Sequence, residues 1–564
     1  MEKPEISTKT QKNPFKWLTP RRLRIFREYS TAYLMIAPST ILVFLFGIFP
    51  VGFALFVSVH KWRLKRGNFV GLKNYVGAVG DIAYLGVFIL GIAALVFAFL
   101  QFKRVYRQLN EKPQHFWFLL FPSFLQGAAT LAFIRWTIIL LPNILDIADK
   151  IRGVEKTRQL FMQLIREAFT AENILPARAQ MLWLITAGLV AGLIVFFKWR
   201  NPDNLQHQAE IALSWITFGI GIVLLLFAYQ EVMTAYQSAA ESGSDPGIIP
   251  QLVNISGGVI LLFIGWKIWQ KAPQASTNRT FFLRIAGAFI FIVGGWLMIG
   301  EIPLILSSGD KDLWQGLKVT LFYALGTIPF QLSISLFLAI LLFQNLKGSS
   351  FFRIMFFMPY VTPTVASAAV FRQLFSNRLQ APVNALLRVF GFEPLKWLWE
   401  PKGIFTLIAD KMGLTNFPDW AAGPSLALVV IIIFSIWVFV GYDTVIYMAG
   451  LGNIPTELSE AAEVDGANKW DIFRFITFPL LSPTTYFLTL IAVIGTFKAF
   501  NHIWVMRLPA SLETADTFSV VIFTEFFEKL RYGYASALAF VLFAIILSLT
   551  YINNKVQGSK VFYG

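Results

Sequence analysis

The strongest constraint on this 564-residue chain is a series of long apolar stretches that runs along its whole length. A helix needs about 20 mostly apolar residues to cross the hydrocarbon core of a bilayer. Twelve stretches meet this requirement: 31–59, 82–101, 116–141, 181–197, 209–234, 252–270, 281–306, 316–344, 353–376, 425–450, 483–506 and 535–554. Charged residues make up only 14% of the chain, against about 25% in soluble domains. The sequence therefore predicts an all-α polytopic membrane protein with about twelve transmembrane helices.

The basic residues predict the orientation of these helices. The formal net charge is +16, and Lys and Arg gather in the tails and in short connections between the apolar stretches. This distribution follows the positive-inside rule and does not form one nucleic-acid-binding face. Segment 1–30 is rich in Lys and Arg and lacks the apolar region of a signal peptide, so we expect a cytoplasmic N-terminal tail. The C-terminal tail is then cytoplasmic as well.

One loop departs from this rule. It follows the first apolar stretch, falls on the external side, and carries five basic residues: Lys61, Arg63, Lys65, Arg66 and Lys73. The remaining connections agree with the scheme, and long external loops tolerate charge. The topology is therefore kept. Two other external segments, 142–180 and 377–424, are long enough to form structure of their own.

A polar stretch, IPTELSEAAEVDGANKWDIFRFITFPLLSP, occupies residues 454–483 between two apolar stretches. Pro455 and Thr456 are typical of a helix start, and Gly466 supplies the left-handed residue that ends a helix. A second amphipathic segment then leads to Pro479. The pattern predicts a solvent-facing pair of short helices, suited to docking into another protein.

The spacing of residues in this stretch resembles the EAA loop of ABC importer permeases. It contains Glu460-Ala461-Ala462, then Gly466, then Ile476 and Phe478-Pro479. Phe478 stands where that family usually has Leu, which exchanges one apolar side chain for another. In the family, this loop sits in a cleft of the ATPase subunit and transmits its movements. The resemblance implies ATPase-coupling roles for Glu460, Ala461, Ala462, Asp465, Gly466 and Pro479.

Further segments are similar to those of the maltose-type sugar permeases. They are FVGLKNY at 69–75, LWQGLKVT at 313–320, FMPYV at 357–361, AGLGNIP at 449–455, FKAFN at 497–501 and YGYA at 532–535. The family's usual TxGGP segment is replaced by Arg507-Leu508-Pro509-Ala510, which leaves the geometry of the external gate open.

These segments divide the chain. The family core has six spans, and the matching blocks hold one span and then five. The resemblance therefore implies an N-terminal tail (1–30), a first core helix with its external loop (31–80), an inserted six-span module (81–310, its body at 82–309), and the remaining permease core (311–564). An even number of inserted spans keeps the loop at 454–483 on the cytoplasmic side.

Polar residues within apolar stretches are candidates for a substrate path, because ionisable groups are costly in a membrane. Sugar sites need hydrogen-bonding groups and aromatic faces. The candidates are Ser435, Tyr442, Asp443, Asn501 and His502. In the maltose-type permeases the ligand cavity draws on the same two helices. The alternative is that Asp443 only pairs with Lys498 or lies near the membrane edge.

The resemblance implies the permease subunit of a binding-protein-dependent ABC importer for a sugar, in the bacterial inner membrane. It also implies three kinds of protein partner: a second homologous permease, a dimer of ATP-binding subunits, and an extracellular or periplasmic binding protein. The sequence has no P-loop, no Cys and four His, so we expect ATP and Mg²⁺ on the partner and no metal or catalytic residue here. The alternatives are a twelve-span secondary transporter, favoured by the span count, and a membrane enzyme or scaffold built on the insertion.

Overall fold

A computed structural model describes residues 20–109, 113–153, 155–198, 202–243, 248–274, 277–299, 309–344, 347–414 and 417–557. Helices dominate these residues, and their one sheet is an antiparallel hairpin of β1 (His60–Trp62) and β2 (Arg66–Phe69). The all-α class predicted from the sequence is confirmed.

Ten helices of the described ranges are long and apolar enough to cross a membrane, and two bent helix pairs bring the number to twelve. In chain order they are Arg27–Ser58, Ile82–Gln108, Phe116–Lys150, Leu175–Val195, Gln206–Glu241, Val253–Gln274, Asn278–Met298, Lys311–Phe343, the pair Ser349–Val361 and Thr364–Leu374, Leu426–Gly452, the pair Lys469–Leu480 and Ser482–Phe497, and Tyr532–Val556. They follow the twelve predicted stretches one by one. The protein is therefore a multi-pass membrane protein.

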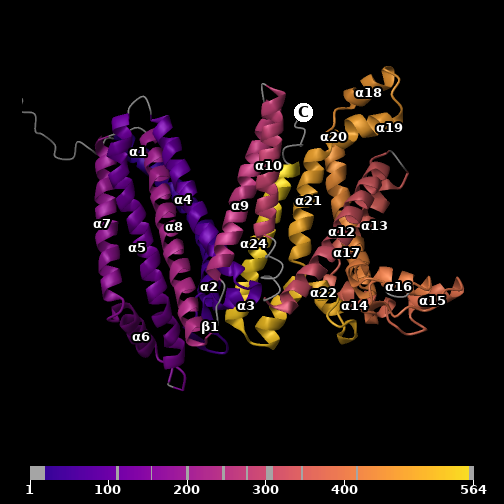
Figure 1. Cartoon of the computed structure of the whole chain (residues 1–564), viewed down its shortest axis with the longest axis horizontal. Helices are drawn as coiled ribbons and strands as arrows, with labels where there is room; N and C mark the ends of the chain where they lie inside the picture. Colours follow the sequence, from indigo (N-terminus) through magenta and orange to yellow (C-terminus); the bar gives the residue numbers. More distant parts are fainter. Residues whose placement is uncertain are drawn as a thin grey trace, which may run out of the picture.

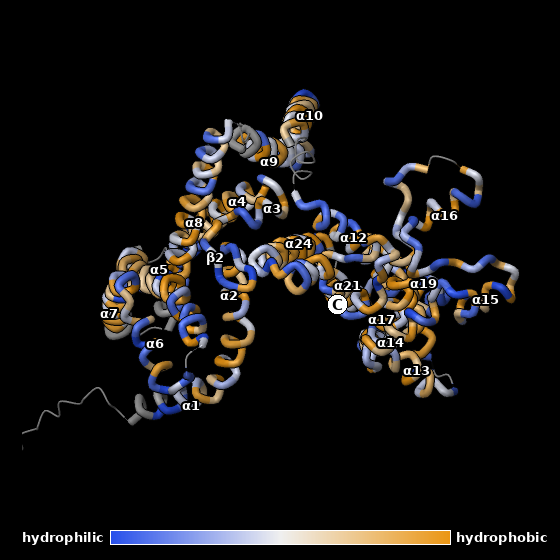
Figure 2. Tube along the Cα trace, turned by 90° about the horizontal axis from the view of Figure 1, so that it is seen from below, coloured by the Kyte–Doolittle hydropathy of each residue, from blue (hydrophilic) through white to orange (hydrophobic). Residues whose placement is uncertain are grey.

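The first half of the chain is built mainly of helices. They are α1 (Pro20–Val43), the π-helical η1 (Phe44–Ile48), α2 (Phe49–Ser58), α3 (Lys73–Val79), α4 (Ile82–Gln108), α5 (Pro113–Lys150), α6 (Arg158–Thr170), α7 (Leu175–Lys198), α8 (Pro202–Glu241), α9 (Ile248–Lys271), η2 (Ala272–Gln274) and α10 (Asn278–Ile299). Helices α4, α5, α7 and α8 pack together, and α9 pairs with α10. Figures 1 and 2 show this group on one side of the molecule.

The second half forms a second bundle, whose last helix also packs against α2 and α3 of the first half. Its elements are α12 (Lys311–Phe343), α13 (Ser349–Val361), α14 (Thr364–Leu374), α15 (Pro382–Val389), η3 (Trp397–Trp399), α16 (Ile404–Lys411), η4 (Asp419–Ala421), α17 (Leu426–Gly452), α18 (Thr456–Val464), α19 (Lys469–Ile472), η5 (Phe473–Thr477), α20 (Phe478–Leu480), α21 (Ser482–Phe497), α22 (Asn501–Met506), η6 (Pro509–Ser511), α23 (Phe518–Phe523), η7 (Thr524–Glu528) and α24 (Tyr532–Gln557). Helix α17 lies at its centre, packed against α12 and α13.

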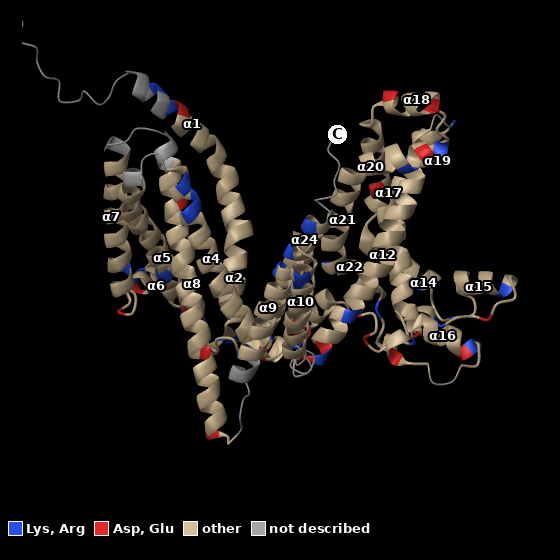
Figure 3. Cartoon of the chain, turned by 45° about the horizontal axis from the view of Figure 1, so that its top comes forward, with Lys and Arg blue, Asp and Glu red and all other residues tan. Residues whose placement is uncertain are grey.

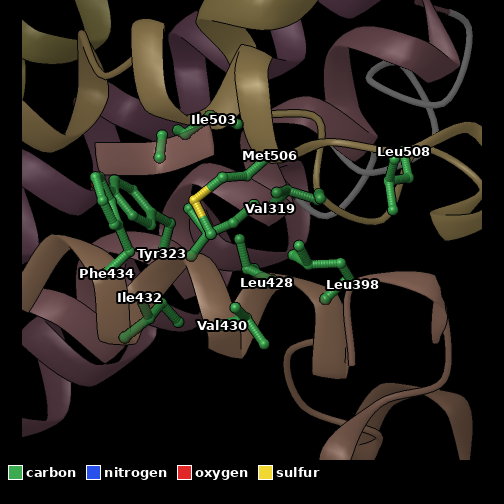
Figure 4. Packing of buried hydrophobic residues seen from close by; sticks show 14 of the residues in the cluster. Val319, Tyr323, Leu398, Leu428, Val430, Ile432, Phe434, Ile503, Met506 and Leu508 are labelled. Atoms are coloured by element: carbon green, nitrogen blue, oxygen red, sulfur yellow. The ribbon is translucent and has the colours of Figure 1, made fainter. Parts of the chain in front are cut away.

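The core of this bundle is an apolar cluster between α12, α17 and α22. Tyr323, Leu428, Phe434, Ile503 and Met506 are buried there (Figure 4). Nearby, α17 approaches α13 so closely that a Cβ on Gly441 would stand 1.9 Å from the Phe356 carbonyl oxygen. Small residues permit such close helix contacts in membrane proteins.

The basic loop after α2 is held by the helices of segment 82–309. Arg66 forms an ion pair with Asp146 of α5, at 2.9 Å. The Glu231 carboxylate of α8 accepts a hydrogen bond from the backbone N–H of Leu72, at 3.0 Å. Gly71 has φ +56°, and a Cβ there would meet the Glu231 carboxylate. The loop that departs from the positive-inside rule therefore meets carboxylates of segment 82–309.

Two of the predicted spans are interrupted in the structure. The stretch 353–376 bends by 94° between α13 and α14, because Thr362 precedes Pro363 and takes an extended conformation that this position favours. The stretch 483–506 is broken as well. Helix α21 ends at Phe497, and α22 begins at Asn501. The spacing in the sequence predicts Lys498 and His502 one turn apart on this span, which is wrong because Lys498 follows α21 and His502 lies in α22.

The two long external segments carry helices. In segment 142–180, α5 continues to Lys150, and α6 packs its apolar face against the end of α5. In segment 377–424, α15 and α16 form a lobe that projects from the core bundle (Figure 1).

Candidate functional site

The polar loop between α17 and α21 begins with a helix whose start and end follow from its own sequence. Pro455 precedes α18, and Glu457 lies in its first turn. Gly466 has φ +86°. Its N–H donates to the Glu463 carbonyl, and the N–H of Ala467 donates to the Ala462 carbonyl, at 3.0 and 2.9 Å. These two bonds form a Schellman motif, which a left-handed glycine makes possible.

The second half of the loop is also fixed locally. The Asn468 side chain accepts hydrogen bonds from the N–H groups of Trp470 and Asp471, and the Asp471 carboxylate accepts one from the N–H of Asn468. This capping box starts α19, which continues through the π-helical η5 into α20. The loop is thus two short helices separated by one glycine break, as predicted.

The surface of this loop is open and partly apolar. Val464, Trp470 and Phe475 expose 88, 63 and 69% of their area. Of the predicted coupling residues, four are exposed and two are half-buried: Glu460, Ala461, Asp465 and Gly466 are exposed, and Ala462 and Pro479 are half-buried. Figure 3 shows α18 and α19 projecting beyond the membrane helices, at the end of the molecule where α1 starts and α24 finishes. An exposed apolar surface on a rigid loop is typical of a protein contact.

The candidate path residues fall into two groups, and the first is buried. The Ser435 hydroxyl lies 2.7 Å from the Tyr323 hydroxyl and 3.1 Å from Nε2 of His502. The Tyr323 hydroxyl is also 3.0 Å from that nitrogen. These three side chains come from α17, α12 and α22, and all are buried. They form a closed hydrogen-bonded triangle that ties three helices together.

Asp443 is buried in a second polar contact. The Gln331 amide donates to its carboxylate at 2.6 Å. One turn further along α12, the Ser335 hydroxyl donates to the backbone carbonyls of Gln331 and Val440. The alternative in which Asp443 pairs with Lys498 is wrong, because Asp443 is bonded to Gln331 while Lys498 is exposed at the end of α21.

Tyr442 and Asn501 form the second group, which reaches the surface of the chain. Tyr442 is half-buried and stacks on Tyr360 of α13, with ring centroids 4.6 Å apart. Asn501 is exposed at the start of α22. A groove of about 650 Å³ lies between α12, α13 and α17, and its apolar lining includes Phe356 and Trp437 but neither Tyr442 nor Asn501. Tyr442 and Asn501 are thus the two candidates whose side chains are not buried in the core.

Sequence reasoning missed the α12 side of this site. Five buried polar residues follow one face of that helix: Thr320, Tyr323, Thr327, Gln331 and Ser335. They recur every three or four residues within an apolar stretch, which is the spacing of one helix face. That stripe was readable in the sequence and indicates a helix whose polar face is turned toward other helices.

An ionic network occupies the opposite end of the core, at the position of the missing TxGGP segment. Arg507 binds Asp516 at 2.9 Å and Glu528 at 3.4 Å, and its guanidinium lies 3.8 Å from the Trp504 ring centroid. Burial raises the pKa of Asp516, and the adjacent Arg507 opposes this shift. The residues that replace the TxGGP segment thus contribute to a charged cluster at this end of the core.

The part of the chain that the structure describes contains no candidate metal site. Within those ranges, no three His, Asp or Glu side chains lie together in a way that could hold an ion.

The comparisons with known proteins match this architecture. Residues 331–557 match the family described as binding-protein-dependent transport system inner membrane component. That range contains α17, the loop of α18 and α19, and the helices that follow it.

Several curated proteins are similar to the chain. A probable ABC transporter permease protein YesP of Bacillus subtilis is 30% identical over 315 residues, which are 55% of this chain and 93% of YesP. The lactose transport system permease protein LacF of Rhizobium radiobacter is 29% identical over 43% of this chain and 75% of its own length. The trehalose/maltose transport system permease protein MalF of Thermococcus litoralis is 26% identical over 44% and 75%.

Among solved structures, a chain of a bacterial alginate ABC transporter, crystallised with an alginate pentasaccharide-bound periplasmic protein, is 22% identical, with a TM-score of 0.38. The match covers 45% of this chain and 81% of that chain. The curated relative YesP is matched along nearly its whole length at 30% identity. The chain therefore belongs to the family of inner membrane components of binding-protein-dependent transport systems, the ABC transporter permeases.

Proposed function

We propose that this chain moves a sugar, an oligosaccharide or related glycoside, into the cell with energy from ATP hydrolysed by separate subunits. The observation that carries the proposal is the exposed two-helix loop at 454–483. The Schellman motif at Gly466 and the capping box at Asn468 order this loop within the chain itself, and a preorganised element loses little entropy on docking. Sugar as the cargo is supported by relatives named for lactose, arabinooligosaccharides and trehalose/maltose.

In this proposal, α18 enters a cleft of an ATP-binding subunit. Glu460 and Asp465 present charge to the cleft, Ala461 and Ala462 allow close approach, and Gly466 fixes the angle between α18 and α19. Pro479 lies in α20, where the loop returns to the membrane. ATP and Mg²⁺ are held by the partner dimer, and this chain transmits the closing of that dimer to α17 and α21.

A second, homologous permease completes the pathway. Helix α1 supports this, because its apolar side chains are exposed along most of its length and its Leu34 and Met35 expose 74 and 76% of their area. The groove between α12, α13 and α17 is a further apolar surface. The substrate path would lie at this interface. Tyr442 and Asn501 would line it, while Ser435, Asp443 and His502 hold the lining helices in place.

The module 82–309 is peripheral in this account. Its helices pack mainly on one another, and only 55% of the chain is needed to match 93% of YesP, so the module can be added outside the core. Its role is membrane anchoring, or a platform for the extracellular or periplasmic binding protein at segment 142–180. The coupling loop, the start of α1 and the end of α24 share one end (Figure 3), which supports cytoplasmic termini in the bacterial inner membrane.

The test uses the full chain reconstituted with its second permease, ATP-binding subunits and binding protein. Glu460→Lys and Gly466→Pro should each abolish substrate-stimulated ATP hydrolysis, because one reverses the charge of α18 and the other removes the N–H and the positive φ of the Schellman motif. The matched control is Glu241→Lys, the same charge reversal at the exposed end of α8. It should keep full activity.

Membrane insertion should be unchanged in all three variants. If both loop variants kept full coupled transport, the assignment of the loop would be wrong.

A further inference from the structure

A groove in the module lies between three of its helices. Helix α5 forms its floor, with Ala128 and Ala132 among the lining residues, and α7 and α8 form its walls. Its volume is about 700 Å³. All three helices are candidate membrane spans, so the surroundings of this groove are the acyl chains of the bilayer.

The lining is apolar except at one point. Ten of the twelve lining residues are Ala, Leu, Ile or Val, and the other two are Arg135 and Gln180. Arg135 donates to the Gln180 side-chain oxygen at 3.0 Å. A groove with one cationic end and an apolar body has the polarity of a phospholipid, with a charged headgroup and apolar tails.

The positive charge of Arg135 has no counterion. No carboxylate in the described ranges forms an ion pair with it, and its hydrogen bond goes to a neutral amide. The side chain is exposed. An unpaired arginine in a membrane helix is costly, which favours an anionic partner from outside the chain.

The depth of this charge fits a headgroup. Arg135 precedes Pro142, where the sequence predicts the start of the external segment, by seven residues, or about 10 Å of helix. Gln180 directly precedes the apolar stretch 181–197. A long basic side chain extends toward the interface from such a depth, and the contact with Gln180 holds the guanidinium there.

We infer that this groove binds an anionic phospholipid of the outer leaflet, with its phosphate on Arg135 and an acyl chain between α7 and α8. The site is independent of the transport path. Arg is well suited to this role, because its planar group binds phosphate through two parallel hydrogen bonds.

The test is native mass spectrometry of the purified full chain with phosphatidylglycerol and phosphatidylcholine of identical acyl chains. The wild type should retain phosphatidylglycerol about fivefold better, the worth of one basic residue near anionic lipid. Arg135→Gln should lose this preference and Arg135→Lys should keep most of it. The matched control, Lys267→Gln, removes one exposed positive charge from α9 and should keep the preference.

A phosphatidylglycerol with a photoreactive acyl chain locates the site. It should label peptides of α5, α7 and α8, and Leu184→Trp, which fills the groove without changing the charge, should reduce the labelling. Equal retention of the two lipids by the wild type would overturn the proposal. So would an unchanged preference in Arg135→Gln, labelling confined to other helices, or cross-linking of the groove to another protein in membranes.

Discussion

The polar residues of the candidate path fall into two groups according to their contacts. Ser435, His502 and Tyr323 satisfy one another inside the core, and Asp443 is satisfied by Gln331. Such closed contacts hold helices in register, because a buried polar group without a partner is costly. Tyr442, in contrast, is half-buried and stacks on Tyr360, and we propose that it contacts the ligand. The sequence identified Ser435, Asp443 and His502 as polar positions in apolar helices, but their partners depend on how α12 rotates against α17.

Tyr442→Ala should therefore lower transport more than assembly. A hydrogen bond to ligand is worth about 0.5–1.5 kcal/mol net, which is roughly a two- to tenfold loss in transport rate at limiting substrate. Uptake of labelled sugar in proteoliposomes measures the rate, and size-exclusion chromatography of the complex measures assembly. Tyr551→Ala, at an exposed tyrosine of α24, is the control. Equal transport by the Tyr442 variant and the wild type would remove Tyr442 from the path.

For single helices, the sequence predicted those features that depend on adjacent residues. Pro455 and Gly466 define the bounds of α18 because helix caps depend on adjacent residues. Pro363 is a local signal for the bend after Thr362, but the stretch 353–376 is apolar and was therefore interpreted as one span. No local signal predicts the joint, by which we mean the contact of Gly71 and Leu72 with Glu231 of α8. Gly71 and Glu231 are far apart in sequence, and their contact depends on the packing of whole helices.

Gly71→Ala should loosen that joint. The new Cβ would lie 2.0 Å from Glu231 Oε1, at a backbone φ of +56°, and left-handed backbone alone costs about 1–2 kcal/mol in a residue with a Cβ. Thermal unfolding of the purified chain should show a lowered midpoint. Limited proteolysis should show faster cleavage near residue 71.

Gly86→Ala is the matched control for this substitution. Gly86 lies in α4, and a Cβ there would meet nothing within 4 Å. Alanine should be neutral or slightly stabilising at such a helical position. A Gly71 variant as stable as the Gly86 variant would contradict the role of the joint.

The whole molecule combines a bundle that matches its relatives with a second group of membrane helices. Hydropathy predicted the number and order of spans, because burial in lipid depends on composition over about 20 residues. It could not predict that α4, α5, α7 and α8 pack as one group, since helix contacts in a bilayer depend on small residues and shape. Gly91 and Gly221 are examples: a Cβ on either would stand within about 3 Å of atoms of the facing helix.

The most direct test of the central claim is a cross-link between the loop and an ATP-binding subunit. The natural chain has no cysteine, so Val464→Cys introduces a single thiol on the most exposed apolar residue of α18. In membranes that contain the whole transport system, with single cysteines placed around the nucleotide-side cleft of the ATP-binding subunit, we expect a disulfide-linked product whose yield changes when ATP is added. Glu241→Cys, at the other end of the molecule, should give none. Absence of any Val464 product, or equal products from both positions, would contradict the account.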